Sequence, residues 1–125
     1  MLSTHCREFR LNICLSYGSR GEIINACQSI VNKSVLDGKP QLITEDLFTN
    51  HLLTMSDQND GPVFPSDPDV LIRTSGEMRI SNFLLWQLAY TEFFFLPCQW
   101  PEVEKKDLIQ VIRKFASARQ RRFGK

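Results

Sequence analysis

The sequence predicts an α/β fold with an open, mostly parallel sheet and crossover helices. Two short apolar runs, 69–74 and 92–96, have the length and composition of buried parallel strands. Segments with helical periodicity alternate with such runs along the chain, which is the element order of this kind of sheet. Ligands of open α/β sheets bind beyond the carboxyl ends of the strands, so a site is expected at that edge.

The first elements expected are a strand, a helix and a second, shorter helix. Residues 11–17 form an apolar run that ends at a glycine turn, as a buried strand does. From Glu22 apolar residues recur at helical spacing, and the turn-forming residues 37–40 end that pattern. Thr44 precedes two acids, which indicates an N-cap and a short helix through about Met55.

The second half of the chain is expected to add a loop and two further helices. Residues 56–68 are rich in proline and aspartate and predict a polar loop or surface insertion. Ser81 can cap a helix over 82–90, and residues 102–121 have the apolar spacing of an amphipathic helix. The sequence has no internal repeat or boundary, so we expect residues 1–125 to form a single domain.

The composition favours a globular, cytoplasmic protein. Of the 125 residues, 42% are hydrophobic, which is enough for one core. The longest apolar run, 83–96, is interrupted by polar residues and is shorter than the roughly 20 residues of a membrane span. The N-terminus lacks the basic-then-apolar pattern of a secretory signal. Peripheral contact with a membrane is therefore the closest membrane association that we expect.

Neither the cysteines nor the charge indicate a zinc site or a nucleic-acid binder. The four cysteines are too far apart for paired zinc ligands, so we expect them to be reduced and structural, since free cysteines are usually buried. The net charge is +1, which argues against nucleic-acid binding. Basic residues do crowd the last thirteen positions, but no aromatic platform accompanies them.

The end of the 69–74 run and the residues after it predict an anion site. Arg73 and Arg79 offer forked donors that match phosphate oxygens, and Gly76 lets backbone approach a ligand closely. Ser81 is expected at a helix N-terminus, where unsatisfied N–H groups attract anions. Glu92, from the next strand, could hold a divalent metal bridged to the phosphates. A diphosphate is the natural ligand of such a site.

Each of these residues also has a structural explanation. Arg73 and Arg79 could simply pair with Glu77, Gly76 could only form a turn, and Ser81 could only cap a helix. The residue types do not by themselves distinguish a nucleotide, a sugar phosphate and an isoprenoid diphosphate.

The full string is more selective. Residues 69–95, DVLIRTSGEMRISNFLLWQLAYTEFFF, followed by Trp100-Pro101, closely resemble the C-terminal signature of cis-prenyltransferases, the family of undecaprenyl and dehydrodolichyl diphosphate synthases. Residues 11–20 resemble the family's earlier strand-and-turn motif, with Ser16 where Asn is usual and Ser19 where a second Gly is common. The resemblance covers residues 8–34 and 66–124.

This resemblance implies the C-terminal half of the cis-prenyltransferase fold, present as a partial domain. The implied activity is cis-condensation of isopentenyl diphosphate onto an allylic diphosphate, which yields a polyprenyl diphosphate of the undecaprenyl or dehydrodolichyl type. The resemblance assigns no catalytic residue. It implies that the diphosphate of isopentenyl diphosphate is held by Arg73, Arg79 and Ser81.

The resemblance also implies a dimer and a metal. Glu92 matches the acid that supports a Mg2+ site across the interface of a homodimer. Arg122 and Gly124 match an Arg-x-Gly motif that reaches the diphosphate site of the partner subunit. For the dehydrodolichyl type, the location would be the cytoplasm, peripheral to a membrane such as the endoplasmic reticulum.

One part of the family pattern has no counterpart in this sequence. The His-x-x-x-Met-Asp-Gly-Asn type motif, which carries the main metal ligand of the family, does not occur. We therefore expect the chain to be a fragment or one part of a split assembly, inactive by itself. The alternative is a non-catalytic partner subunit of a heteromeric cis-prenyltransferase. The presence of Arg73, Arg79, Ser81 and Glu92 favours the catalytic lineage.

Overall fold

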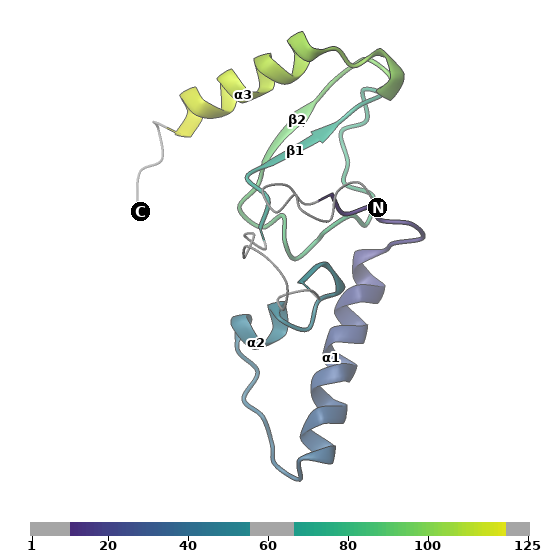
Figure 1. The fold of residues 1–125 in the computed structure, drawn as a ribbon, viewed down its shortest axis with the longest axis vertical. Coiled ribbons are helices and arrows are strands. Elements are labelled where there is room, and N and C mark those ends of the chain that lie inside the picture. The colour runs from purple at the N-terminus through teal and green to yellow at the C-terminus, as the bar shows by residue number, and fades with distance from the viewer. Residues whose placement is uncertain (1–10, 56–66, 120–125) are drawn as a thin grey trace, which may run out of the picture. The chain divides into compact units, whose positions relative to one another are not determined.

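The computed structural model describes residues 11–55 and 67–119 of the chain. These residues divide into two compact units, which are described separately (Figure 1). The first unit combines residues 11–55 with 81–86, and the second combines 67–80 with 87–119. The expectation of a single domain stays a prediction. Most of the expected 56–68 loop lies outside the described residues.

The first unit is built on α1 (Ser19–Leu36), the helix expected from the apolar spacing after Glu22. Its buried face carries Ala26 and Ile30, each 1% exposed, which pack with Phe48 and Leu52 from the following segment. This spacing of four residues places both side chains on one face of the helix.

The two ends of α1 are closed in different ways. At its C-terminus Gly38 takes a φ of 63°, a left-handed value that favours glycine after a helix. At its N-terminus the cap residue Gly18 has no side chain to offer. Asn82 supplies the cap instead, because its carbonyl accepts from the N–H of Ser19 at 2.9 Å and its Oδ1 accepts from the N–H of Arg20 at 2.9 Å.

Thr44 begins α2 (Glu45–Thr49), as predicted, and its Oγ1 accepts from the N–H of Leu47 at 3.1 Å. The helix is shorter than expected. From His51 the backbone N–H groups bond three residues back instead of four, and a 3-10 turn, η1 (Leu53–Met55), follows. The expected continuous helix through about Met55 is therefore broken by this tighter winding.

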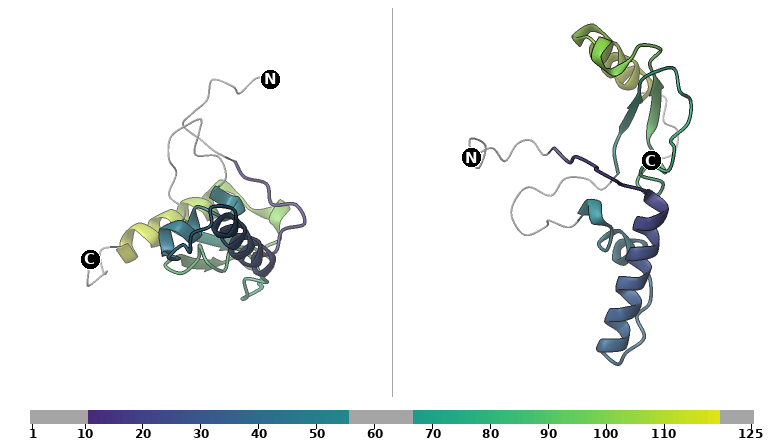
Figure 2. Two further views of the ribbon diagram at one scale, coloured as in Figure 1. Left: turned by 90° about the horizontal axis from the view of Figure 1, so that it is seen from below. Right: turned by 90° about the vertical axis from the view of Figure 1, so that its right-hand side faces the viewer.

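The second unit contains the two strands expected from the apolar runs. They are β1 (Val70–Arg73) and β2 (Glu92–Phe95), and they pair in parallel (Figure 2). The parallel pairing of an α/β fold is confirmed. The described sheet has only two strands, so it is smaller than the open sheet that the sequence predicts.

The C-terminal helix is confirmed in its described part. A short 3-10 turn, η2 (Trp100–Glu102), precedes α3 (Lys105–Arg119), so the helix begins three residues later than expected. Val111 on α3 is 3% exposed. Across the part of the chain that the structure describes, no helix is both long and apolar enough to cross a bilayer.

The strand expected over 11–17 is wrong. These residues form no strand, and Leu11, Ile13 and Leu15 are 70%, 73% and 83% exposed. The reason is that a strand needs a neighbour to pair its backbone groups. In the described residues β1 and β2 pair only with each other.

The helix expected over 82–90 is also wrong. This segment is a series of turns, in which Ser81, Asn82 and Leu84 have φ values of 46°, 62° and 48°. Left-handed values cannot continue a right-handed helix. The backbone and side chain of Asn82 instead bond to the first turn of α1, and Leu85 donates its N–H to Oγ of Ser19 at 2.9 Å.

Candidate functional site

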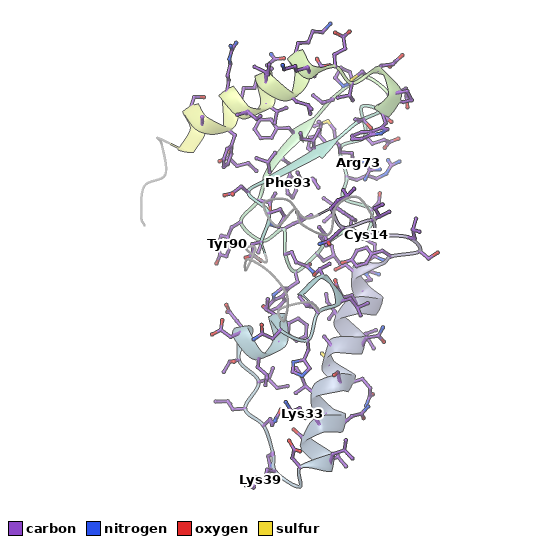
Figure 3. The ribbon with its side chains drawn as sticks, in the orientation of Figure 1. Cys14, Lys33, Lys39, Arg73, Tyr90 and Phe93 are labelled. Carbon is purple, nitrogen blue, oxygen red and sulfur yellow. The ribbon has the colours of Figure 1, made fainter. Side chains whose placement is uncertain are left out.

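The loop after β1 brings together the two arginines that the sequence singled out. Arg73 is the last residue of β1 and is half-buried (Figure 3). Its Nη1 donates to the carbonyl oxygen of Arg79. Arg79 in turn pairs through Nη1 with Oε2 of Glu77 at 2.5 Å, with its side chain 66% exposed. Two guanidinium groups therefore belong to one short loop at the carboxyl end of β1.

A turn at Ser75 and Gly76 holds this loop against the segment after β2. The two residues have φ values of 70° and 67°. Their N–H groups donate to the carbonyls of Cys98 at 2.8 Å and Leu96 at 2.9 Å, and Oγ of Ser75 donates to Oε1 of Gln99 at 2.9 Å. The positive φ alone favours glycine at 76, because a Cβ there would meet no atom within 4 Å and crowding therefore plays no part. The backbone N–H groups of Ser75 and Gly76 therefore already have acceptors within the protein and are not free to bind an anion.

Ser81 does not have the setting that the sequence predicts. It lies at the start of a series of turns and belongs to the first unit, whereas both arginines belong to the second. The expected contribution of a helix N-terminus to anion binding is therefore wrong for this segment, because turns and not a helix begin directly after Ser81. Its assignment to the diphosphate stays a prediction.

Glu92 lies at the other end of the sheet from the arginine loop. It is the first residue of β2 and pairs with Val70, while Arg73 pairs with Phe95. Because the strands are parallel, three residue steps of roughly 3.3 Å each, about 10 Å, separate the two ends of this ladder. The structure of this chain does not bring Glu92 to the arginines. Arg122 and Gly124 lie outside the described residues.

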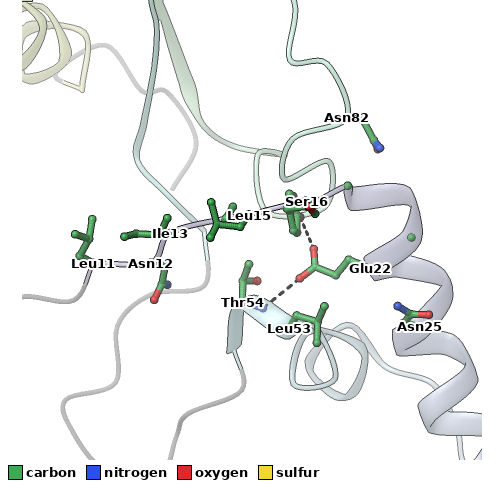
Figure 4. A pocket seen from close by; sticks show the side chains of 14 residues that line it. Leu11, Asn12, Ile13, Leu15, Ser16, Glu22, Asn25, Leu53, Thr54 and Asn82 are labelled. Atoms are coloured by element: carbon green, nitrogen blue, oxygen red, sulfur yellow. Dashed lines mark hydrogen bonds between the residues drawn. The ribbon is translucent and has the colours of Figure 1, made fainter. Parts of the chain in front are cut away.

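The first unit contains a buried carboxylate that was not among the predicted site residues. Glu22 is 2% exposed, its Oε2 accepts from the hydroxyl of Tyr17 at 2.5 Å, and its Oε1 accepts from the N–H of Thr54 at 3.1 Å (Figure 4). Burial, and then the hydrogen bond to Glu22, raise the pKa of Tyr17 to about 12. The helical spacing of the sequence could have predicted this burial, because Glu22 lies on the same face of the helix as Ala26 and Ile30.

A pocket of about 860 Å³ adjoins this carboxylate. The extended segment 11–18 forms much of its wall, and Glu22, Asn25, Thr54 and Asn82 also line it (Figure 4). Its walls combine the apolar side chains of the extended segment with polar groups from the helix. Of the described residues with predicted roles in diphosphate binding, Arg73, Arg79 and Ser81 do not line this pocket.

Comparison with known proteins decides the family. Residues 1–124 match the family described as "putative undecaprenyl diphosphate synthase". The chain belongs to this family of cis-prenyltransferases. It is 44% identical over 123 residues to an isoprenyl transferase of Listeria innocua and 50% identical over 117 residues to one of Streptococcus pyogenes. The matches cover 98% and 92% of this chain but 45% of each relative, so the chain spans about half the length of these isoprenyl transferases.

Solved structures of cis-prenyltransferase relatives share the fold. Lavandulyl diphosphate synthase from Lavandula x intermedia, solved with dimethylallyl diphosphate, matches with a TM-score of 0.70 and 33% identity, over 89% of this chain and 43% of its own. A probable undecaprenyl diphosphate synthase from Campylobacter jejuni matches with a TM-score of 0.62 and 30% identity, over 87% and 43%. The motif resemblance and its restriction to a portion of the fold are thus confirmed.

The cis-prenyltransferase family is consistent with magnesium, but the described residues do not fit a complete magnesium site. Among residues 11–55 and 67–119, no group of three or more histidine, cysteine, aspartate or glutamate side chains could hold an ion. Mg2+ requires octahedral oxygen coordination, and Glu92 contributes one carboxylate. No reaction step is therefore assigned to a metal. Cys14, Cys27 and Cys98 are free thiols, but Cys14 and Cys27 are exposed, so the expected structural, buried role is wrong for these two.

Proposed function

We propose that this chain supplies the isopentenyl diphosphate site of a cis-prenyltransferase. The observation that carries the proposal is the loop in which Arg73 and Arg79 lie together at the carboxyl end of β1. Guanidinium groups match diphosphate oxygens in geometry as well as in charge. The edge at which they lie is also the edge where open α/β sheets bind ligands.

The relatives support a prenyl diphosphate as the ligand. The matching sequences are isoprenyl transferases, and the lavandulyl diphosphate synthase structure contains dimethylallyl diphosphate. Together with the arginine loop, these findings favour an isoprenoid diphosphate over a nucleotide or a sugar phosphate.

The reaction would be the cis-condensation of isopentenyl diphosphate with an allylic diphosphate. The allylic carbon–oxygen bond breaks and diphosphate leaves, the double bond of isopentenyl diphosphate forms the new carbon–carbon bond, and a proton is lost to leave a cis double bond. Arg73 and Arg79 would hold the diphosphate group of isopentenyl diphosphate, so that the double bond of this substrate faces the allylic carbon. Positioning of this kind can supply a large part of the rate enhancement.

Further residues would complete the site in the whole protein. Ser81 would contact the same diphosphate. In a homodimer, Arg122 and Gly124 would reach the partner's diphosphate site, and Glu92 would support a Mg2+ site at the interface. The product would be an undecaprenyl or dehydrodolichyl diphosphate, made in the cytoplasm at the periphery of a membrane.

Calorimetric titration of the 125-residue chain with isopentenyl diphosphate tests the arginine assignment. Arg79→Gln should weaken binding by about tenfold or more, because a hydrogen bond to a charged group contributes roughly 1.5 to 3 kcal/mol. Arg113→Gln, at an exposed position of α3, is the matched control and should change binding little. Equal losses in the two variants would show that only the overall charge matters and would contradict the proposed site.

A second candidate is a non-catalytic subunit that pairs with a catalytic cis-prenyltransferase. The exposed apolar side chains of Leu11, Ile13 and Leu15 favour it, because such a surface suits burial by another chain. Coexpression with a full-length family member, followed by the mass of the complex in size-exclusion chromatography, distinguishes the candidates. A complex only with the other protein supports the subunit, and self-association supports the homodimer.

A further inference from the structure

Glu77 is a carboxylate built into the arginine loop, and the proposed function gives it no role. Its Oε2 lies 2.5 Å from Nη1 of Arg79, and its side chain is 38% exposed. Glu77 and Arg79 are only two positions apart in the chain. The Glu77 carboxylate therefore already occupies one of the Arg79 nitrogens that the proposed site would offer to a diphosphate.

Charge and geometry set up a competition at Arg79. A guanidinium has five N–H donors in a planar fork, and a carboxylate oxygen on Nη1 removes part of that fork from any bidentate contact with phosphate. The carboxylate also lowers the local positive potential that attracts an anion. Because the Arg79 side chain is 66% exposed, exchange of the carboxylate for an incoming anion does not require unpacking of a core.

We propose that Glu77 is a resident counter-ion of Arg79, which a bound diphosphate displaces. The inference rests on the proposed function, since it concerns the same arginine loop. Under it, Glu77 sets how strongly the loop binds anions, and it neutralises Arg79 when no diphosphate is present. Glu77 then acts through Arg79, as a residue that tunes affinity.

Glu77→Gln is the direct test, with inorganic diphosphate as the probe and calorimetry at low salt as the measurement. The substitution keeps the size of the side chain but removes the charge that competes. Exposed ion pairs are weak, so the gain in affinity should be about two- to fivefold. Glu104→Gln is the matched control, because it removes the same charge from another exposed pair of the second unit, Glu104 with Lys106 at 3.0 Å.

A double-mutant cycle shows whether the effect passes through Arg79. If Glu77 acts by occupying Arg79, then Glu77→Gln should improve binding in the native chain but not in an Arg79→Gln background. A gain of the same size in both backgrounds would mean that Glu77 acts only through general charge, and would overturn the proposal.

The remaining outcomes separate this inference from the function on which it rests. If the native chain binds diphosphate and loses affinity in Arg79→Gln, but Glu77→Gln matches Glu104→Gln or binds more weakly, then only the counter-ion role is overturned. If Arg79→Gln leaves diphosphate affinity unchanged, the arginine loop is not the site, and the proposed function fails together with the counter-ion.

Discussion

Glu22 and Tyr17 form a buried acid–phenol pair in the first unit. The carboxylate of Glu22 receives two donors, the hydroxyl of Tyr17 and the N–H of Thr54, so a side chain that is 2% exposed still has hydrogen-bond partners. The three residues come from α1, from the extended segment before it and from η1. The pair thus ties three separate parts of the unit together through one carboxylate.

The raised pKa of Tyr17 predicts a specific loss of stability in alkali. Its pKa is about 12 in the folded chain and 10.0 in an unfolded one. Between these values the folded state binds more protons, so the free energy of unfolding should fall as pH rises from 10 to 12. Denaturant unfolding at several pH values measures this fall, and Tyr17→Phe should remove this component of it.

Spectroscopic titration provides an independent check on the same tyrosine. The chain has two tyrosines, so a Tyr90→Phe variant leaves Tyr17 as the only source of the tyrosinate absorbance. The absorbance should then rise with a midpoint near 12. A midpoint near 10 would contradict the buried pair.

At the scale of elements, local chemistry predicted some segments and long-range contacts determined others. β1, β2, α3 and the N-cap at Thr44 follow from patterns within a few residues, and the structure has them. The 82–90 segment depends on Asn82, which bonds to the N-terminus of α1 more than sixty residues earlier in the chain. No local pattern contains that information, and a nine-residue helix has little stability of its own to oppose it.

The candidate site divides in the same way. The arginine loop was predictable because Arg73, Glu77 and Arg79 lie within seven positions around one turn. The position of Glu92 depended on the register of β1 and β2, which the sequence does not state. The partners of Glu22 depended on how α1 packs with the extended segment before it, which carries Tyr17, and with η1, which carries Thr54.

The cap of α1 gives a prediction for Asn82. Asn82→Ala should lower the free energy of unfolding by about 1 kcal/mol, because it removes the side-chain oxygen that accepts from Arg20. Asn82→Asp keeps an acceptor at the same position and should be close to the native chain. Urea denaturation measures both.

A control for this prediction lies in the same helix. Gln28→Ala removes an exposed bond from Nε2 to Oδ1 of Asn32, at 2.9 Å, and should change the free energy by less than about 0.5 kcal/mol. If Asn82→Asp proved as unstable as Asn82→Ala, the side-chain oxygen would not be what supports the helix.

At the scale of the whole molecule, the chain corresponds to about 45% of the isoprenyl transferases that it matches. The described residues contain the proposed diphosphate loop and no cluster of metal ligands. A prenyl transfer needs a second diphosphate site, and the sequence lacks the motif that holds it in the family. Under the proposed function, this chain would hold one of the two substrates and the second would bind elsewhere.

We therefore predict that the 125-residue chain does not elongate a prenyl chain by itself. Incubation with Mg2+, farnesyl diphosphate and labelled isopentenyl diphosphate should give no longer product above background. The full-length Listeria innocua isoprenyl transferase, in parallel, is the positive control. Robust elongation by this chain alone would refute the assignment of a half-site.

The parallel register of β1 and β2 has a consequence for how the two ends of the sheet can change. Arg73 and Glu92 are about 10 Å apart along the ladder, and residues at such distances contribute to stability almost independently. Within this chain, a substitution at one end therefore demands no compensating substitution at the other. The arginine loop and Glu92, at the opposite end of the strands, are free to diverge separately. Any coevolution between them would have to arise from a shared ligand or a second subunit.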